Sequence, residues 1–179
     1  MNIEDDCNWL PPKIKLEDFN GEWTKYYQKL YDKFVEDFIT KPPYFDKKVV
    51  NIRVNPKQNN FEHAFVHLTC ETMKDGITLN DRIPDIRRCE RIGWNKAIIT
   101  NYPCNNNCQN CKKILYYEEY YKNTIRITLL FYDTRFKVVL EKRKNYYLLI
   151  TGYYINYDFR LNKELKKVVK FSKQKTPLD

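Results

Sequence analysis

The sequence predicts an α+β protein in which N-terminal helices pack on a C-terminal four-stranded antiparallel meander and a basic helix closes the chain. Two observations indicate this fold class. Between Trp23 and Ile39, apolar side chains recur every three to four residues, as they do along one face of an α-helix. After residue 112, short breaks separate runs rich in Tyr, Ile, Val, Leu and Thr, a pattern typical of β-hairpins.

The first hundred residues are predicted to be an extended lead-in at 1–15 followed by a helical and mixed part at 16–100. Asp18 or Asn20 is expected to cap the Trp23–Ile39 helix, which Pro42-Pro43 ends. The other expected elements are a strand at Val49–Val54, a buried segment at Phe61–Thr69, a short helix at Pro84–Ile92 with Pro84 in its first turn, and an apolar run at Trp94–Ile99.

The last third of the chain is predicted to be a β-meander at 112–157 and a basic helix with its tail at 158–179. The expected strands are Ile114–Tyr121, Thr124–Phe131, Phe136–Glu141 and Tyr146–Ile155, and the helix is Asp158–Lys173. Short breaks make consecutive strands pair antiparallel. The chain of 179 residues suits one hydrophobic core, so residues 1–179 are expected to form a single domain.

The sequence gives no sign of a membrane partner. It holds no run of about 18 apolar residues, the length that a transmembrane helix needs. Its start, Met1-Asn2-Ile3-Glu4-Asp5-Asp6, is acidic and lacks the apolar region of a signal peptide. We therefore expect a cytoplasmic protein whose cysteines are thiols or metal ligands rather than disulfides.

The positive charge is concentrated in the C-terminal part. Residues 1–111 carry 16 basic and 16 acidic side chains, whereas residues 112–179 carry 16 basic and 7 acidic ones, so the net charge of +9 lies in this part. Such one-sided charge attracts polyanions, and RNA is the expected partner. The alternative is codon bias, because an AT-rich genome over-encodes the Lys, Asn, Tyr and Ile that are abundant here.

Histidine is the first candidate for chemistry, because its side chain titrates near neutral pH. The chain has only His63 and His67, which share a face whether the segment is a strand or a helix. In a strand, Thr69 would join them. The alternative is that His67, next to Phe and Leu, is a core residue.

Arg87, Arg88 and Arg91 place three guanidiniums within five residues, and arginine matches phosphate oxygens bidentately. On a helix, Arg87 and Arg91 share a face while Arg88 points elsewhere. A salt-bridged surface helix, with one arginine paired to Glu90, explains the pattern equally well.

The last predicted strand supplies further polar groups. Alternation places Thr151 and Tyr153 on one face of this strand, and Gly152 and Tyr154 on the other. The hydroxyl of Thr151 and the phenol of Tyr153 could bind a phosphate or stack on a base. Lys142 and Arg143, which end the preceding strand, would add positive charge.

Cys104, Cys108 and Cys111 form the only candidate metal site. Two-residue spacing is typical of structural zinc, but no fourth ligand lies nearby in the sequence. Free loop thiols are the alternative. Only four glycines and no carboxylate cluster are present, which argues against an NTPase and against a two-metal nuclease. No cofactor other than this zinc is expected.

The chain resembles a family of mostly uncharacterised bacterial proteins that are often linked to mobile elements. The resemblance runs from Trp9 to about Phe171 and is carried by Tyr31-x-x-Phe34-x-x-Asp37-Phe38, Phe65-x-His67-Leu68-Thr69, Arg82-Ile83-Pro84-Asp85-Ile86-Arg87-Arg88-Cys89-Glu90-Arg91-Ile92-x-Trp94, Val138-Val139-Leu140-x-x-Arg143 and Thr151-Gly152-Tyr153. The chain departs from that family at Val66, Thr100 and Gly152, where Trp, Glu and Ala are expected, and in its cysteine loop.

The predicted layout is also similar to the barnase/colicin/RelE-like ribonuclease superfamily, an analogy of architecture. These observations favour a metal-independent endoribonuclease, a toxin or phage-defence effector that cleaves RNA through its 2′-OH. His67 would be the general acid or base, Arg91 with Arg88 the phosphate clamp, and Thr151 with Tyr153 the substrate contacts. Thr69, Arg87, Lys142 and Arg143 would assist substrate binding.

Two other functions remain open. One is a non-catalytic module that binds RNA or a protein partner, such as the neutralising half of a two-protein system, and a toxin would itself have a cognate antitoxin as partner. The other is a DNA-binding regulator, which is less favoured because no helix-turn-helix pattern is evident. Catalysis requires His67, an arginine and Thr151 or Tyr153 to converge, whereas binding requires only a basic face.

Overall fold

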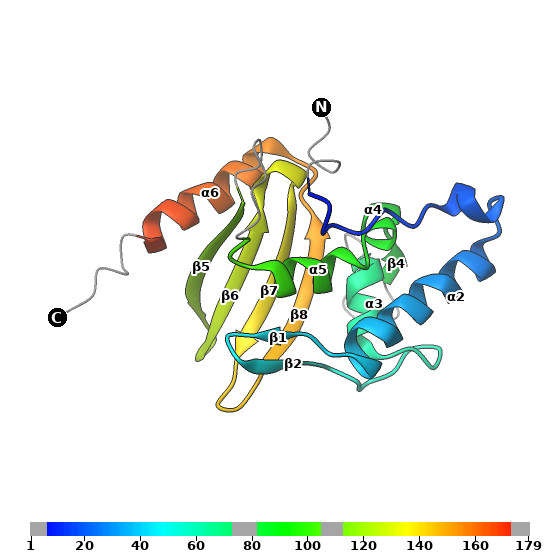
Figure 1. Ribbon diagram of the computed structural model, residues 1–179, viewed down its shortest axis with the longest axis horizontal. Helices are drawn as coiled ribbons and strands as arrows, with labels where there is room; N and C mark the ends of the chain where they lie inside the picture. The colour runs from blue at the N-terminus through cyan, green and yellow to red at the C-terminus, as the bar shows by residue number, and fades with distance from the viewer. Residues whose placement is uncertain (1–6, 73–81, 105–112, 173–179) are drawn as a thin grey trace.

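The computed structural model describes residues 7–72, 82–104 and 113–172 (Figure 1). Its helical elements are η1 (Leu16–Phe19), α2 (Trp23–Phe34), the π-helix η2 (Val35–Thr40), α3 (His63–Thr69), α4 (Ile86–Glu90), α5 (Trp94–Asn101), η4 (Tyr132–Thr134) and α6 (Asp158–Ser172). Its strands are β1 (Tyr44–Phe45), β2 (Lys48–Ile52), β3 (Cys70–Thr72), β4 (Arg82–Pro84), β5 (Ile114–Tyr121), β6 (Thr124–Phe131), β7 (Phe136–Lys142) and β8 (Tyr147–Tyr154). The α+β class is confirmed.

The main sheet has six strands in the order β1-β2-β8-β7-β6-β5. Strands β5 to β8 pair antiparallel with their chain neighbours, whereas β2 adds to β8 in parallel and β1 pairs with β2. The prediction of a four-stranded, wholly antiparallel sheet is therefore wrong, because the sheet has six strands and β2 is parallel to β8. The sequence analysis recognised β2 as a strand but could not assign its partner, because nearly a hundred residues separate β2 from β8.

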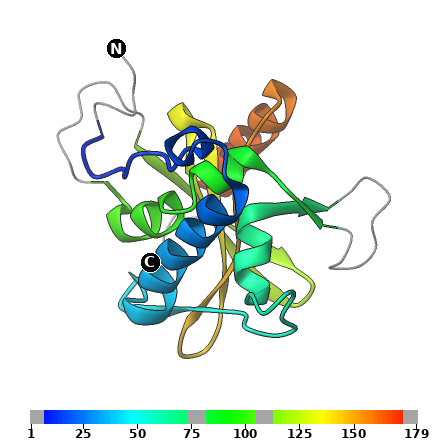
Figure 2. The same cartoon turned by 90° about the vertical axis from the view of Figure 1, so that its right-hand side faces the viewer.

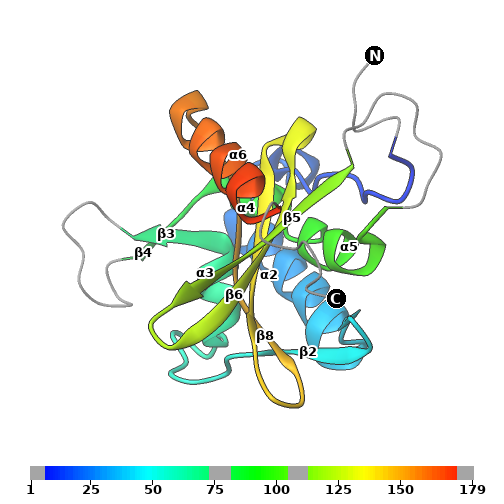
Figure 3. The same ribbon diagram turned by 90° about the vertical axis from the view of Figure 1, so that its left-hand side faces the viewer.

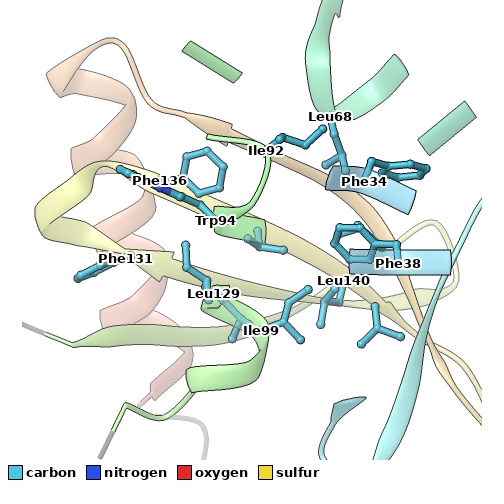
Figure 4. Close-up of a cluster of buried hydrophobic side chains, with 14 of the residues drawn as sticks. Phe34, Phe38, Leu68, Ile92, Trp94, Ile99, Leu129, Phe131, Phe136 and Leu140 are labelled. Carbon is cyan, nitrogen blue, oxygen red and sulfur yellow. The ribbon is translucent and has the colours of Figure 1, made fainter. Parts of the chain in front are cut away.

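One face of the sheet carries the main hydrophobic core (Figure 4). Leu129, Phe136 and Leu140 project from the sheet, and helices α2, α3 and α5 cover them with Phe34, Leu68 and Ile99 among others. Trp94, 1 % exposed, packs on Phe136 with ring centroids 5.6 Å apart. Its Nε1 donates to the carbonyl of Pro11 (2.8 Å), which ties the lead-in segment to the core.

Helix α6 lies against the opposite face (Figure 3). Leu130 of β6, Ile155 and Leu161 form a small second cluster there, against which Tyr153 packs. Two ion pairs fix the helix to the sheet, Lys137 with Glu164 (2.9 Å) and Lys167 with Glu119 (2.8 Å). The closing helix was thus predicted correctly through the last described residue.

The structure corrects two predictions about helix starts. Glu22 is the N-cap of α2, while Asn20 ends η1 in a left-handed conformation (φ 53°) and Asp18 accepts from the backbone N–H of Lys15. Pro84 ends strand β4 rather than opening a helix. Asp85 caps α4 instead, since its carboxylate accepts from the backbone N–H groups of Arg87 and Arg88.

The C-terminal half of β8 lies at an edge of the sheet. Strand β2 pairs only with Tyr147–Leu149, and beyond this point helices α3 and α4 take the place of a neighbouring strand (Figures 1 and 2). The register between β7 and β8 shifts at Ile150, because Val139 pairs with Thr151 while Leu140 pairs with Leu149. This β-bulge turns Tyr153 toward the α6 face and Gly152 toward the main core.

Among the described residues, no helix has both the length and the apolar character that crossing a bilayer requires.

Candidate functional site

Both histidines lie on α3, where their rings stack with centroids 4.2 Å apart and an interplanar angle of 23°. The helix forms because Ala64, Phe65 and Leu68 follow helical spacing and are buried in the main core. His63 and His67, one turn apart, share the other side and are half-buried. Of the two conformations left open by the sequence, the structure has the helix.

The start of α3 is anchored to the segment that leaves β2. The backbone N–H groups of His63 and Ala64 donate to the carbonyls of Val54 and Arg53, both at 2.9 Å. These are two of the helix's first N–H groups, which have no partner within the helix. The anchoring brings the exposed Arg53 to the N-terminal end of the histidine pair.

The end of α3 is joined to α4 through the antiparallel pair of β3 and β4. The carbonyl of Thr69 accepts from the backbone N–H of Asp85 (2.9 Å), and β3 pairs with β4 from Cys70–Pro84 to Thr72–Arg82. Arg88 then reaches back from α4, and its Nη1 donates to the carbonyl of His67 (3.1 Å). Two more arginines, Arg82 and Arg88, thereby approach the histidines.

We call His63, His67, Arg53, Arg82 and Arg88 the α3 site. Burial, Arg82, His63, Arg53 and Arg88 together lower the pKa of His67 from 6.5 to about 3. Burial, Arg53 and Arg82 also lower the pKa of His63. In the part of the chain that the structure describes, no carboxylate forms an ion pair with Arg53 or Arg82. The α3 site is therefore a neutral imidazole pair in a positive field.

Tyr153 of β8 borders the α3 site. The Cζ of Arg88 lies 4.9 Å from the centroid of the Tyr153 ring, a cation–π contact. Thr151 projects from the same face of β8, two residues away, and is half-buried. Arg88 thus contacts both Tyr153 and His67, but it reaches the backbone carbonyl of His67 rather than its ring, so convergence of the three side chains in one catalytic site stays a prediction.

Arg88 also has a structural role. Its Nε lies 3.5 Å from a carboxylate oxygen of Asp85, and its bond to His67 O satisfies one of the last carbonyls of α3, which have no partner within the helix. A guanidinium held by these contacts is pre-oriented. Any phosphate contact that it makes would use its remaining N–H groups.

Thr69 lies away from the α3 site, which corrects its predicted place beside the histidines as a substrate-binding residue. In a helix, residues two apart point in nearly opposite directions, so Thr69 faces the interior and is 0 % exposed. Its hydroxyl donates to the carbonyl of Phe65 (2.9 Å) and lies 3.1 Å from the hydroxyl of Tyr27. A substrate cannot contact Thr69 in this conformation.

Arg87 and Arg91 lie on the other side of β8, around Tyr154. Their Cζ atoms are 5.4 and 5.0 Å from the Tyr154 ring centroid. Arg91 is 9 % exposed, and its Nη1 donates to the carbonyl of Arg87 (3.0 Å) and to Glu90 (3.3 Å). Because Tyr153 and Tyr154 project from opposite faces, the predicted clamp of Arg88 and Arg91 is divided between two surfaces.

Lys142 and Arg143 are at the far end of the β7–β8 hairpin. Lys142 pairs with Tyr147, six residues from Tyr153, which corresponds to roughly 20 Å along a strand. Arg143 forms an ion pair with Glu141. The structure does not bring these two cations to the α3 site.

The predicted zinc loop is described only in part. Cys104 is buried, while Cys108 and Cys111 lie outside the described residues. Among residues 7–72, 82–104 and 113–172, no three His, Cys, Asp or Glu side chains are grouped as metal ligands would be. Zinc at Cys104, Cys108 and Cys111 stays a prediction.

Sequence reasoning missed Arg53 and Arg82, and it gave His63 no role of its own. Arg53 precedes the histidines by ten residues and Arg82 follows them by fifteen, so only the tertiary structure brings them together. A local signal existed only for the histidines, whose spacing of four residues is that of one helical face.

No protein-family model, curated protein or solved structure matches this chain. The family resemblance inferred from the motifs accordingly stays a prediction.

Proposed function

We propose that the protein is a metal-independent endoribonuclease that cleaves RNA through the 2′-OH at the α3 site. The observation that carries the proposal is the stacked pair of neutral imidazoles, His63 and His67, beside Arg53, Arg82 and Arg88. Cleavage by the 2′-OH needs a base, a proton donor and positive charge at the phosphorane, and these residue types supply all three.

The arginines would bind the scissile phosphate and adjust the basicity of His67. In the free protein, Arg82, Arg53 and Arg88 disfavour the imidazolium and keep the pKa of His67 low. A bound phosphodiester anion would offset their field and raise that pKa toward neutrality. His67 would therefore become an effective base when the substrate is in place.

The 2′-oxygen attacks phosphorus as His67 takes the 2′-proton and becomes an imidazolium. The bond from phosphorus to the 5′-oxygen breaks, and this imidazolium gives its proton to the leaving oxygen, which returns His67 to the neutral form. The products are a 2′,3′-cyclic phosphate and a 5′-hydroxyl. The ring of His63 stacks on that of His67 with centroids 4.2 Å apart, and two imidazoliums this close would repel each other, so the pair would hold no more than one extra proton.

Tyr153 and Thr151 would contact the nucleotide beside the scissile phosphate. The Tyr153 ring already carries Arg88 and Lys137, whose Cζ and Nζ lie 4.9 and 5.1 Å from its centroid, and this half-buried side chain would present its exposed edge to the nucleotide. The resemblance to the mobile-element family supports a role as a cytoplasmic toxin or phage-defence effector, with a cognate antitoxin as the protein partner.

A second candidate function is a non-catalytic module that binds RNA or a protein. It is favoured by the contacts of Arg88 with Asp85 and with the carbonyl of His67, which suffice to explain this arginine as a helix cap. Such a module would bind RNA through its basic face and leave it intact.

Incubation of the purified protein with total RNA in EDTA distinguishes the two functions. Wild-type protein should fragment the RNA, and His67→Ala should lose at least about a hundredfold in rate, the usual contribution of a general base. Val66→Ala is a neighbouring substitution on the buried side of α3, and its cleavage rate per folded molecule should equal that of the wild type. Intact RNA with the wild-type protein, or equal cleavage by His67→Ala, would contradict the ribonuclease proposal.

A further inference from the structure

A pocket of about 330 Å³ lies between the end of β8 and α6. Tyr153, Phe159 and the basic residues Arg160, Lys163 and Lys167 line it, together with Glu164. The Cζ of Arg88, which belongs to the α3 site, lies 4.9 Å from the ring centroid of Tyr153, so one side chain of the pocket borders that site. Helix α6 contributes the aromatic and basic side chains Phe159, Arg160, Lys163 and Lys167. The sequence did not single out any of these four as a candidate site residue.

The mouth of this pocket carries a solvent-exposed aromatic pair. Tyr157 and Phe159 are 55 % and 67 % exposed, and their rings stack with centroids 5.6 Å apart. The Cζ of Arg160 lies 5.4 and 5.8 Å from the two centroids. Exposed aromatic rings beside an arginine are the arrangement on which unpaired bases stack in proteins that bind single strands.

The charges of the pocket favour a polyanion. Glu164 is occupied by Lys137 at 2.9 Å and by the hydroxyl of Tyr117, and Lys167 is paired with Glu119 at 2.8 Å. Arg160 and Lys163, by contrast, form no ion pair with any carboxylate of the described residues. Two uncompensated cations therefore remain next to the aromatic pair.

We propose that this pocket binds single-stranded RNA adjacent to the α3 site. One base would stack on Phe159, and Arg160 with Lys163 would contact the neighbouring phosphates. Tyr153 would lie between this nucleotide and the scissile phosphate held near Arg88. The role as a substrate subsite rests on the proposed ribonuclease function, whereas binding of the single strand does not.

Fluorescence anisotropy with a labelled, fully 2′-O-methylated single-stranded oligonucleotide of about eight nucleotides tests this site, because such RNA has no 2′-OH to react. Phe159→Ala should weaken binding about tenfold or more. Lys163→Ala should weaken binding several-fold and should reduce the slope of log K against log salt by about 0.7.

Two matched controls separate the pocket from general surface properties. Tyr120→Ala removes another exposed aromatic ring (85 % exposed), and Lys166→Ala removes a charge from the same helix outside the pocket. Both variants should bind the oligonucleotide with an affinity within about twofold of that of the wild type. In Lys166→Ala, the remaining difference should be the salt-dependent loss of affinity that removal of any cation from a basic face causes. All four substituted side chains are solvent-exposed, so the folded state should be retained.

The outcomes of binding and cleavage are distinguishable. Binding that depends on Phe159 and Lys163, without cleavage of unmodified RNA, would support the pocket and contradict the ribonuclease. Binding by Phe159→Ala equal to that of the wild type would overturn the proposed pocket, even if His67-dependent cleavage is observed. Binding of a protein but no oligonucleotide would overturn it as well.

Discussion

Gly152 should tolerate no larger residue, although it lies in a strand whose backbone conformation suits any side chain. A Cβ added to Gly152 would overlap Oδ1 of Asn95 and lie 2.9 Å from its Cγ. Asn95 is 0 % exposed, and its Nδ2 donates to the carbonyl of Ile92 at 2.9 Å. The amide therefore cannot move aside without breaking a buried hydrogen bond.

Gly152→Ala should lower the free energy of unfolding by about 2–4 kcal/mol. Overpacking of a filled core costs about 1–3 kcal/mol, and loss of the Asn95 hydrogen bond adds about 1 kcal/mol if the side chain is displaced. For a chain of this length, that corresponds to a fall of about 5–15 °C in Tm. Urea and thermal unfolding, followed by circular dichroism, measure both quantities.

Two further variants test the cause. Gly93→Ala is the matched control, because its Cβ would meet only Cε of Lys33 and the ring of Pro11, both at 3.3 Å, and Lys33 is flexible. It should cost less than about 1 kcal/mol. Asn95→Ala combined with Gly152→Ala should be less destabilising than the sum of the two single changes, by at least about 1 kcal/mol. A cost of under about 0.5 kcal/mol for Gly152→Ala alone would refute the packing described for β8 and α5.

Three other predictions concern the proposed site and the cysteine loop. Since the pKa of His67 is about 3 in the folded protein and 6.5 in the unfolded chain, the contribution of His67 to stability should be constant above pH 6.5 and fall as the pH decreases toward 3. The free energy of unfolding should fall by about 1–2 kcal/mol over this range, after allowance for solvent screening of the part-exposed ring. Urea titrations at several pH values should show a smaller fall for His67→Gln. Arg88→Lys keeps the positive charge but loses the guanidinium that can contact two phosphate oxygens at once. It should therefore reduce the rate of RNA cleavage more than it reduces the affinity for RNA. Metal analysis of protein purified without chelator should find about one zinc per chain if Cys104, Cys108 and Cys111 bind it, and a content near zero would contradict that prediction.

Local patterns in the sequence predicted most elements of the fold. The apolar stripe from Trp23 corresponds to α2 and η2, and the four strand runs after residue 112 correspond to β5, β6, β7 and β8 within one residue at each end. These patterns are reliable because each strand or helix buries one of its own faces. The addition of β2 to β8 escaped prediction because strand pairing over a long sequence separation leaves no local pattern.

The candidate site was predictable only in part, for the same reason. Arg88 was expected near His67 and donates to its backbone carbonyl, and Tyr153, expected near the same arginine, lies 4.9 Å from its Cζ. Arg53 was missed because backbone hydrogen bonds between α3 and the chain after β2 position it. Thr69 was misplaced because it joins the histidines only in a strand, one of the two conformations that the sequence left open, and the segment is a helix in which Phe65 and Leu68 are buried.

Identification of the RNA ends formed by the wild-type protein tests the proposed chemistry most directly. An oligoribonucleotide and its copy with a 2′-deoxy substitution at the cleaved position are incubated in EDTA, and the fragments are analysed by mass spectrometry. We predict a 2′,3′-cyclic phosphate on the 5′ fragment and an intact deoxy-substituted oligonucleotide. Cleavage of both substrates at the same rate, or no fragments from either, would contradict a reaction through the 2′-OH at His67.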